Sequence, residues 1–238
     1  MSNMAISPRS SRHPQVSRAS GYCSRWSFIL DWCKGRSVLH LGFVGETHRS
    51  LDKKLEAFGD GRILHSHLTR TASSVVGLDR DEQAVQTIQS KFGDDGLIVG
   101  DVEHLEQLPL HGAFDMILFG DLIEHLSCPG RALEGIRRFM APNSELIIST
   151  PNAFGRLANI RFTLGRFCEG NEHVAAYSQL TLPALLARHQ FKMTEFYTCF
   201  DRPPQSWKKR FAFALGIPLF KVMPDRGGTL LAVARSEA

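Results

Sequence analysis

The sequence predicts an α/β fold in which a mostly parallel sheet is covered by helices on both faces. Three observations support it. Short, nearly continuous apolar runs alternate with longer segments of helical spacing, which is typical of strands buried on both sides. Glycine and acidic residues follow several of these runs directly. The chain has 238 residues, of which 43% are hydrophobic and 22% charged, enough for one large domain with a full core.

The chain begins with a Ser-, Arg- and Pro-rich segment, residues 1–20, which has too few large apolar groups to order itself. We therefore expect a disordered tail followed by a single domain over residues 21–238. The first predicted helix spans residues 26–34 and ends at Gly35, where glycine allows a left-handed cap.

Short apolar runs bounded by Gly, Asp or Pro predict five strands, at residues 37–42, 75–79, 97–100, 114–119 and 145–150. Helical spacing between them predicts helices at roughly residues 64–72, 82–92, 122–125 and 131–140. A further helix at residues 182–189 precedes two last strands, at residues 191–198 and 229–234. Because a loop rather than a helix joins these two strands, we expect an antiparallel hairpin at the sheet edge.

Composition and charge narrow the class of protein. The longest apolar run, residues 211–220, is too short to span a bilayer. Five scattered cysteines without a C-x-x-C motif fit a reducing compartment, and we expect the cytoplasm; the Arg- and Ser-rich start leaves an organelle transit peptide as an alternative. Net charge is +4, with basic residues in excess at both ends and acidic residues in excess between them. This asymmetry fits either a solvated basic face or an anionic partner near the C-terminal third.

Polar and glycine residues gather at the predicted strand ends, where open α/β sheets bind ligands. The first strand runs into Gly42-Phe43-Val44-Gly45-Glu46, and the second ends in Asp79, placed to accept hydrogen bonds from ribose hydroxyls. The third ends in Gly100-Asp101-Val102-Glu103 and the fourth in Gly120-Asp121-Leu122-Ile123-Glu124-His125. Each feature alone is weak, since such residues also form tight turns and helix caps. Four in this order indicate a ligand site.

These segments resemble the class I S-adenosylmethionine (SAM)-dependent methyltransferases, over roughly residues 32–152. The motifs that carry the resemblance are VLHLG, VVGLDRDEQAV, IVGDVEHL, FDMILFGDLIEHLSCPGRAL and FMAPNSELIISTPN, similar to the branch of quinone-biosynthesis and glycan- or natural-product-associated O-methyltransferases. The resemblance implies a doubly wound seven-stranded sheet ending in the antiparallel pair, with SAM as cofactor. It implies cofactor contacts along the strand ends, at Gly42, Phe43, Gly45, Asp79, Arg80, Asp101, Val102, Phe119 and Gly120.

Two residues depart from the family pattern. His40 stands where an acidic residue is usual, and Val44 replaces the middle glycine of G-x-G-x-G. A β-branched residue there would hinder a close approach of the backbone, so Val44→Gly is expected to keep the fold and tighten cofactor binding. The departures also leave open a non-catalytic protein of this fold that binds or stabilises a partner.

For the chemistry, His125 and His173 are the candidate bases, with Glu124 orienting His125 and Asp121 either catalytic or a helix cap. Either histidine is equally compatible with a surface or capping role. A neutral imidazole base predicts a rate that falls as the pH drops through about 6.5. We expect both rings to face one cavity together with residues 211–220, and we expect no metal site.

The acceptor is expected to be a small molecule or a glycan, methylated on oxygen or less readily on nitrogen, and no nucleic-acid partner is expected. Residues 156–200 are assigned to an acceptor-side loop and helix, and residues 201–223 to a basic and apolar insert. Within this insert, residues 207–222 combine Trp207, three successive cations and an apolar run. Packing as a lid explains them, as does contact with a membrane surface or a lipid-like substrate. The sequence does not specify the oligomeric state.

Overall fold

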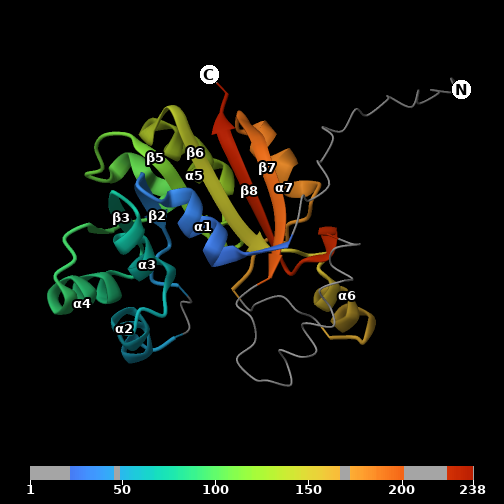
Figure 1. Ribbon diagram of the computed structural model, residues 1–238, viewed down its shortest axis with the longest axis horizontal. Helices are drawn as coiled ribbons and strands as arrows, with labels where there is room; N and C mark the ends of the chain where they lie inside the picture. The colour runs from blue at the N-terminus through green and yellow to red at the C-terminus, as the bar shows by residue number, and fades with distance from the viewer. Residues whose placement is uncertain (1–21, 46–48, 167–171, 201–223, 238) are drawn as a thin grey trace, which may run out of the picture.

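The computed structural model describes residues 22–45, 49–166, 172–200 and 224–237. An eight-stranded sheet forms the centre, in the order β1-β7-β8-β6-β5-β2-β3-β4 (Figure 1). The strands are β1 (Tyr22–Ser24), β2 (Ser37–Leu41), β3 (Ser74–Asp79), β4 (Leu97–Val99), β5 (Phe114–Gly120), β6 (Met140–Pro151), β7 (Phe191–Phe200) and β8 (Thr229–Ser236). All neighbours pair in parallel except β8, which lies antiparallel between β6 and β7. The predicted α/β class, its seven strands and the closing antiparallel pair are confirmed.

Seven α-helices and four short 3-10 helices connect the strands in the described ranges. The α-helices are α1 (Arg25–Cys33), α2 (Leu51–Gly59), α3 (Leu64–Thr71), α4 (Glu82–Phe92), α5 (Pro129–Ile136), α6 (Arg156–Thr163) and α7 (Thr181–Arg188). The 3-10 helices are η1 (Val102–Gln107), η2 (Ile123–His125), η3 (Arg137–Phe139) and η4 (Pro224–Arg226). Within the same ranges, no helix combines the length and apolar character that a bilayer crossing demands.

Alternate side chains of the strands build two cores, one on each face of the sheet. Leu39 and Leu41 of β2 pack with residues of α5 and α7, whereas Val38 packs with α1 and α3. A third cluster joins α2 and α4 to the loop after β2. Because both faces of the sheet are buried, the sequences of these strands are nearly unbroken apolar runs.

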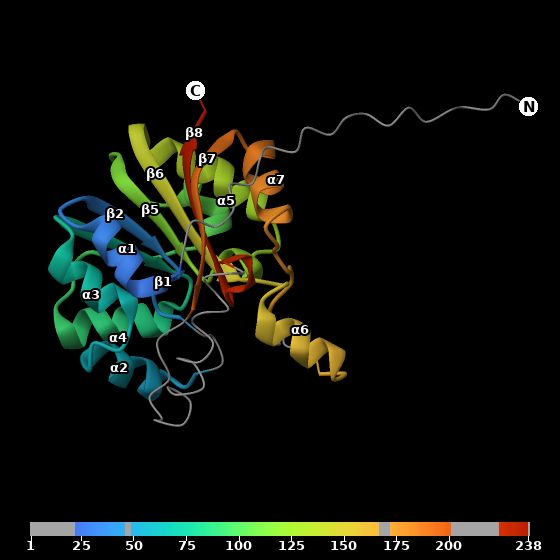
Figure 2. The ribbon, with the colours of Figure 1, turned by 45° about the vertical axis from the view of Figure 1, so that its right-hand side comes forward.

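Besides the 3-10 helices η1 and η4, three elements carry no prediction from the sequence: β1, α2 and α6. The three residues of β1 are ordered by pairing with β7, Tyr22 opposite Thr198, and so short a strand has no pattern of its own. Helix α2 buries the apolar side chains of Leu55 and Ala57, and these give its sequence only a weak amphipathic pattern. Helix α6 exposes its large apolar side chains, Ile160 and Phe162 among them, and stands away from the sheet (Figure 2). The predicted tail (residues 1–20) and the whole predicted insert (residues 201–223), including residues 207–222 and 211–220, lie outside the described residues.

The amino end of β6 is held by one buried carboxylate, Glu145. Its Oε2 accepts hydrogen bonds from Trp32 Nε1 (2.9 Å) and Arg36 (2.7 Å), and its Oε1 accepts one from Arg235 (2.8 Å). Burial alone would raise the pKa of Glu145, but these three donors outweigh burial and lower it. The carboxylate therefore ties α1, β6 and β8 together at the end of the sheet opposite to the carboxyl ends of the parallel strands.

We predict that Glu145→Ala lowers the free energy of unfolding by about 1–2 kcal/mol, because it leaves Trp32 Nε1 and two half-exposed arginines without their shared acceptor. Since the folded state depresses the pKa of Glu145 below its ordinary value near 4.5, the wild-type advantage should be full above that value and vanish as the pH falls through the depressed pKa. Urea unfolding of both proteins across this range measures it. An equal difference at all pH values would contradict the ionic origin of the effect.

Candidate functional site

A cavity of about 700 Å³ opens at the carboxyl ends of β2, β3, β4 and β5. The strand order reverses between β2 and β5, since β3 and β4 continue on one side and β6 on the other. Open α/β sheets bind ligands at such a switch point, and the volume is that of small-molecule sites, about 300–1,000 Å³. The cavity is lined by His173, the second candidate base, and by most of the residues predicted from the strand ends: Gly42, Phe43, Gly45, Asp79, Arg80, Asp101, Val102, Gly120, Asp121, Glu124 and His125.

One predicted cofactor residue does not reach the cavity. The side chain of Phe119 is fully buried and packs in the core under α5 and α7. Because Phe119 and Gly120 are neighbours on a strand, their side-chain positions face opposite sides of the sheet. Only Gly120 lies at the cavity surface.

The loop after β2 has a conformation that requires its two glycines. Gly42 and Gly45 have φ values of +70° and +88°, a region that favours glycine. A Cβ atom on Gly42 would also lie 2.9 Å from Leu122 Cδ1. Val44 has no such φ value; it is 6% exposed and packs in the cluster with Leu55 and Val85. The structure therefore does not support the expectation that Val44 strains the loop, because its side chain faces the core.

We predict that Val44→Gly destabilises the protein by about 2 kcal/mol, from the apolar surface it no longer buries and the backbone entropy that glycine adds. Cofactor affinity should stay equal or fall, since a looser loop costs more to order. Thermal unfolding and titration with S-adenosylhomocysteine measure the two effects. Tighter binding at unchanged stability would restore the expectation from the sequence.

Asp79 connects this loop to the start of α4. Its Oδ2 accepts a hydrogen bond from the Val44 N–H (2.9 Å) and its Oδ1 one from the Asp81 N–H (3.0 Å). Burial raises the pKa of Asp79 above its usual range, although both backbone bonds oppose the rise. Each carboxylate oxygen has a second lone pair, so Asp79 can also accept hydrogen bonds from a ligand in the cavity.

Asp121 is held in an unusual conformation at the end of β5. Its φ is +52°, which costs free energy for a residue other than glycine and often marks a functional site. Its Oδ1 accepts a hydrogen bond from Ser149 Oγ (3.1 Å), and its Oδ2 forms an ion pair with Arg25. Arg25 precedes the first predicted helix and has no motif around it, so only the folded chain brings it to the cavity.

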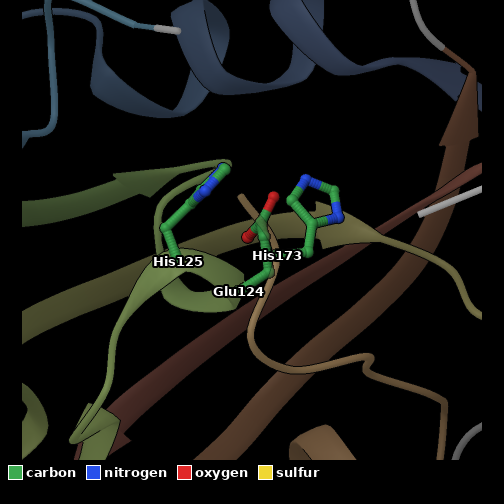
Figure 3. A group of neighbouring side chains, drawn as sticks. All are labelled: Glu124, His125 and His173. Carbon is green, nitrogen blue, oxygen red and sulfur yellow. The ribbon is translucent and has the colours of Figure 1, made fainter. Parts of the chain in front are cut away.

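Glu124, His125 and His173 form a compact group at the cavity wall (Figure 3), with the carboxylate of Glu124 next to both imidazole rings. Each offers one ligand atom, and these atoms lie within 4.8 Å of one another. The two imidazole rings meet edge to face with their centroids 4.7 Å apart. The structure thus brings together three residues predicted for chemistry, two of them 48 positions apart in the sequence.

Backbone hydrogen bonds hold this group in place. The Glu124 carbonyl accepts from the Val174 N–H (2.9 Å) and the Ala175 N–H (3.2 Å), which ties the loop of His173 to η2. His125 Nδ1 lies 3.2 Å from the Glu172 carbonyl oxygen. A carbonyl only accepts, so in the neutral ring Nδ1 carries the proton and Nε2 has the lone pair.

Glu124 is the most buried member of the group, at 1% exposure. Thr150 Oγ1 donates to its Oε2 (2.9 Å), whereas its Oε1 is buried without a hydrogen-bond partner. Burial raises the pKa of Glu124, opposed by Thr150 and the two imidazoles. A hydrogen-bond donor, a proton on the carboxyl group or a cation would satisfy Oε1.

The comparisons with known proteins agree with this fold and cavity. A family model described as a methyltransferase domain matches residues 44–195. Because the match covers more than half of the chain, the protein belongs to this methyltransferase family. Membership agrees with the resemblance to SAM-dependent methyltransferases found in the sequence, the resemblance that implies SAM as the cofactor.

The curated relatives are more distant. The chain is 30% identical over 95 residues to a ubiquinone biosynthesis O-methyltransferase of Caulobacter sp., covering 39% of this chain and 38% of the relative. It is 24% identical over 154 residues to a protein of the same name from Klebsiella pneumoniae subsp. pneumoniae, covering 60% of this chain and 63% of the relative. The matches therefore span less than two thirds of these relatives.

Solved structures share the fold. A S-adenosylmethionine-dependent methyltransferase from Clostridium acetobutylicum superposes with a TM-score of 0.57 at 12% identity, covering 90% of this chain and 91% of that one. A SAM-dependent methyltransferase from Archaeoglobus fulgidus gives 0.54 at 18% identity, covering 88% and 90%.

The residues present fit SAM. The cavity combines a glycine loop for close backbone approach with a buried carboxylate, Asp79, that can accept from vicinal hydroxyls. Asp101 and Val102 extend the wall at the end of β4.

We predict that Asp79→Ala weakens S-adenosylhomocysteine binding by about 1.5–3 kcal/mol, the value of hydrogen bonds to a charged group. Because burial raises the pKa of Asp79, wild-type affinity should fall on acidification at a higher pH than an ordinary Asp would give, and Asp79→Asn should remove this step. Calorimetric titration measures both.

Asp115→Ala is a matched control. Asp115 Oδ2 also accepts two hydrogen bonds, from Ser37 N and Ser37 Oγ (2.8 Å each), at the opposite end of the sheet. Equal losses of affinity in the Asp79 and Asp115 variants would assign the effect to stability rather than to contact with the cofactor.

Proposed function

We propose that this protein transfers the methyl group of SAM to an oxygen atom of a small-molecule or glycan acceptor. The observation that carries the proposal is the group Glu124, His125 and His173, which lines the same cavity as the glycine loop and Asp79. The curated relatives named O-methyltransferases support oxygen over nitrogen as the accepting atom.

In this proposal the strand ends hold the cofactor. The Gly42–Gly45 loop approaches its methionine part, Asp79 accepts from the ribose, and Asp101 and Val102 contact the adenine. SAM supplies a methyl group on a sulfonium, which is already a good leaving group. The protein therefore contributes mainly by positioning the acceptor and excluding water.

An alcohol or phenol acceptor must also lose a proton. His125 is oriented for this role, because its Nδ1 faces the Glu172 carbonyl and its Nε2 keeps a free lone pair. His173 packs against the same ring and is the second candidate base. Glu124 stabilises a charged imidazole beside it.

A second role for the group is favoured by the unpartnered Oε1 of Glu124. Two imidazoles and a carboxylate with ligand atoms within 4.8 Å of one another suit a divalent cation such as Zn²⁺ or Mn²⁺. A cation there would satisfy Oε1 and would lower the pKa of an acceptor hydroxyl. We did not expect a metal from the sequence, because it contains no zinc-binding motif and because Glu124 and His173 are far apart in the chain.

We predict that His125→Ala and His173→Ala each reduce kcat at least about tenfold, the lower part of the range for a positioned base. The dissociation constant of S-adenosylhomocysteine should change less than about twofold, since neither side chain belongs to the cofactor end of the cavity. Turnover can be followed as S-adenosylhomocysteine release with a panel of catechols, phenols and sugars. The exposed His111 supplies the control, His111→Ala. Unchanged turnover in both site variants would contradict the proposal.

Removing metal ions with a chelator tests whether the histidines act as proton acceptors or as ligands of a cation. If the group holds a cation, dialysis against EDTA lowers turnover and adding Zn²⁺ or Mn²⁺ restores it in the wild type but not in His173→Ala. Turnover that is indifferent to EDTA would leave the histidines as proton acceptors and remove the cation from the proposal.

A further inference from the structure

An ion pair belongs to the wall of the cavity at the end of β5. Arg25 Nη1 pairs with Asp121 Oδ2, and both residues line the cavity. Asp121 directly follows Gly120, a predicted cofactor contact, and it precedes Glu124 by three positions. In the chain, Asp121 therefore stands between the residues assigned to the cofactor and the group assigned to the chemistry.

Arg25 reaches the cavity because of the strand that precedes it. Strand β1 is the outermost strand of the sheet and pairs in parallel with β7, so its carboxyl end points to the side of the sheet that holds the cavity. Helix α1 begins there with Arg25 and then crosses the sheet face (Figure 1), where it buries Ile29 and Cys33 against β5, β6 and β8. The wall at Arg25 thus comes from the opposite edge of the sheet from β3 and β4.

The backbone of Asp121 does not explain why this residue carries a charge. Its φ of +52° is tolerated by Asn as well as by Asp. An Asn side-chain oxygen could also accept the hydrogen bond that Ser149 Oγ donates to Asp121 Oδ1 (3.1 Å). What the carboxylate adds to the amide is a negative charge, and Arg25 balances it.

Stability gives little reason for the pair. The side chains of Arg25 and Asp121 are 17% and 36% exposed, and ion pairs that solvent reaches contribute little to folding. Their place beside the binding site of a cationic cofactor suggests an electrostatic role instead.

We propose that Arg25 neutralises Asp121 so that the sulfonium group of SAM does not face an unbalanced carboxylate at the point of methyl transfer. Arg25 is then a positioning residue that acts through Asp121. The pair holds the start of α1 at the end of β5 without placing a net charge beside the sulfur atom.

The inference rests on the proposed function, which places the ribose at Asp79 on β3. From there the methionine part of the cofactor extends toward β2 and β5, and the methyl group must come within reach of the acceptor held at His125. Asp121 borders this position, because it lies between Gly120 and the 3-10 helix η2 that carries His125.

The reaction itself explains why an unbalanced carboxylate would be harmful. The bond between the methyl carbon and sulfur breaks, its electron pair stays on sulfur, and a bond to the acceptor oxygen forms while the acceptor proton goes to the base. The positive charge on sulfur is therefore smaller in the transition state than in the bound cofactor. A lone carboxylate would stabilise the bound cofactor more than the transition state, which lowers kcat.

Two ligands that differ in charge at sulfur test the proposal: SAM, with its sulfonium, and S-adenosylhomocysteine, with a neutral thioether. Calorimetric titration without acceptor gives the ratio of their affinities. Asp121→Asn leaves Arg25 unbalanced and should weaken SAM relative to S-adenosylhomocysteine about tenfold. Arg25→Gln leaves Asp121 unbalanced and should strengthen SAM relative to S-adenosylhomocysteine by a similar factor. The double variant should return to the wild-type ratio.

Turnover gives a second readout. We expect Arg25→Gln to lower kcat about threefold or more although its relative affinity for SAM is higher. A purely structural role would weaken both ligands alike and leave their ratio unchanged. The matched control is Arg235→Gln, which removes an ion pair with Glu145 at the other end of the sheet and should not change the ratio.

Arg25→Lys keeps the positive charge and should keep the wild-type ratio; a shift like that of Arg25→Gln would contradict an effect of charge. An unchanged ratio in both neutral variants, or shifts in the same direction, would overturn the inference while leaving the proposed function intact, since both ligands still bind. Absence of binding of either ligand to the wild-type protein would refute the proposed function and the inference together.

Discussion

The parallel pairing of β2 with both β3 and β5 is the constraint on which the site depends. It places the ends of these strands side by side at the point where the strand order reverses. The backbone after each strand must turn away there, so glycine, aspartate and short helices follow. Asp79 reinforces the arrangement by bonding the loop after β2 and the turn before α4 with one carboxylate.

The cavity contains carboxyl groups and imidazoles that are buried to different degrees, and burial shifts their pKa values. Burial raises the pKa values of Asp79 and Glu124 and lowers that of His40, so all three are biased toward neutrality unless a ligand or a cation compensates. We expect cofactor and acceptor binding to be coupled to protonation for this reason.

Stability and function are separated along the strands. At the amino end, Glu145 gathers donors from α1, β8 and the turn before β2, and its contacts serve the fold. At the carboxyl end, the chain accepts features that cost stability: a positive φ at Asp121, an unpartnered Glu124 oxygen and the two buried imidazoles of His40 and His65. Such costs persist where a function requires them.

The sequence by itself determined the layered α/β fold, because buried parallel strands and amphipathic helices leave distinct periodicities, and α4 was predicted at its observed bounds. It also identified the strand-end residues, since β-strand ends converge in any sheet of this class. Only the tertiary structure decided which distant side chains meet: His173 with His125, His65 with His40, and Arg25 with Asp121. It likewise turned Val44 toward the core and Phe119 away from the cavity. These contacts depend on loop paths and helix packing over long sequence separations, for which a local pattern contains no signal.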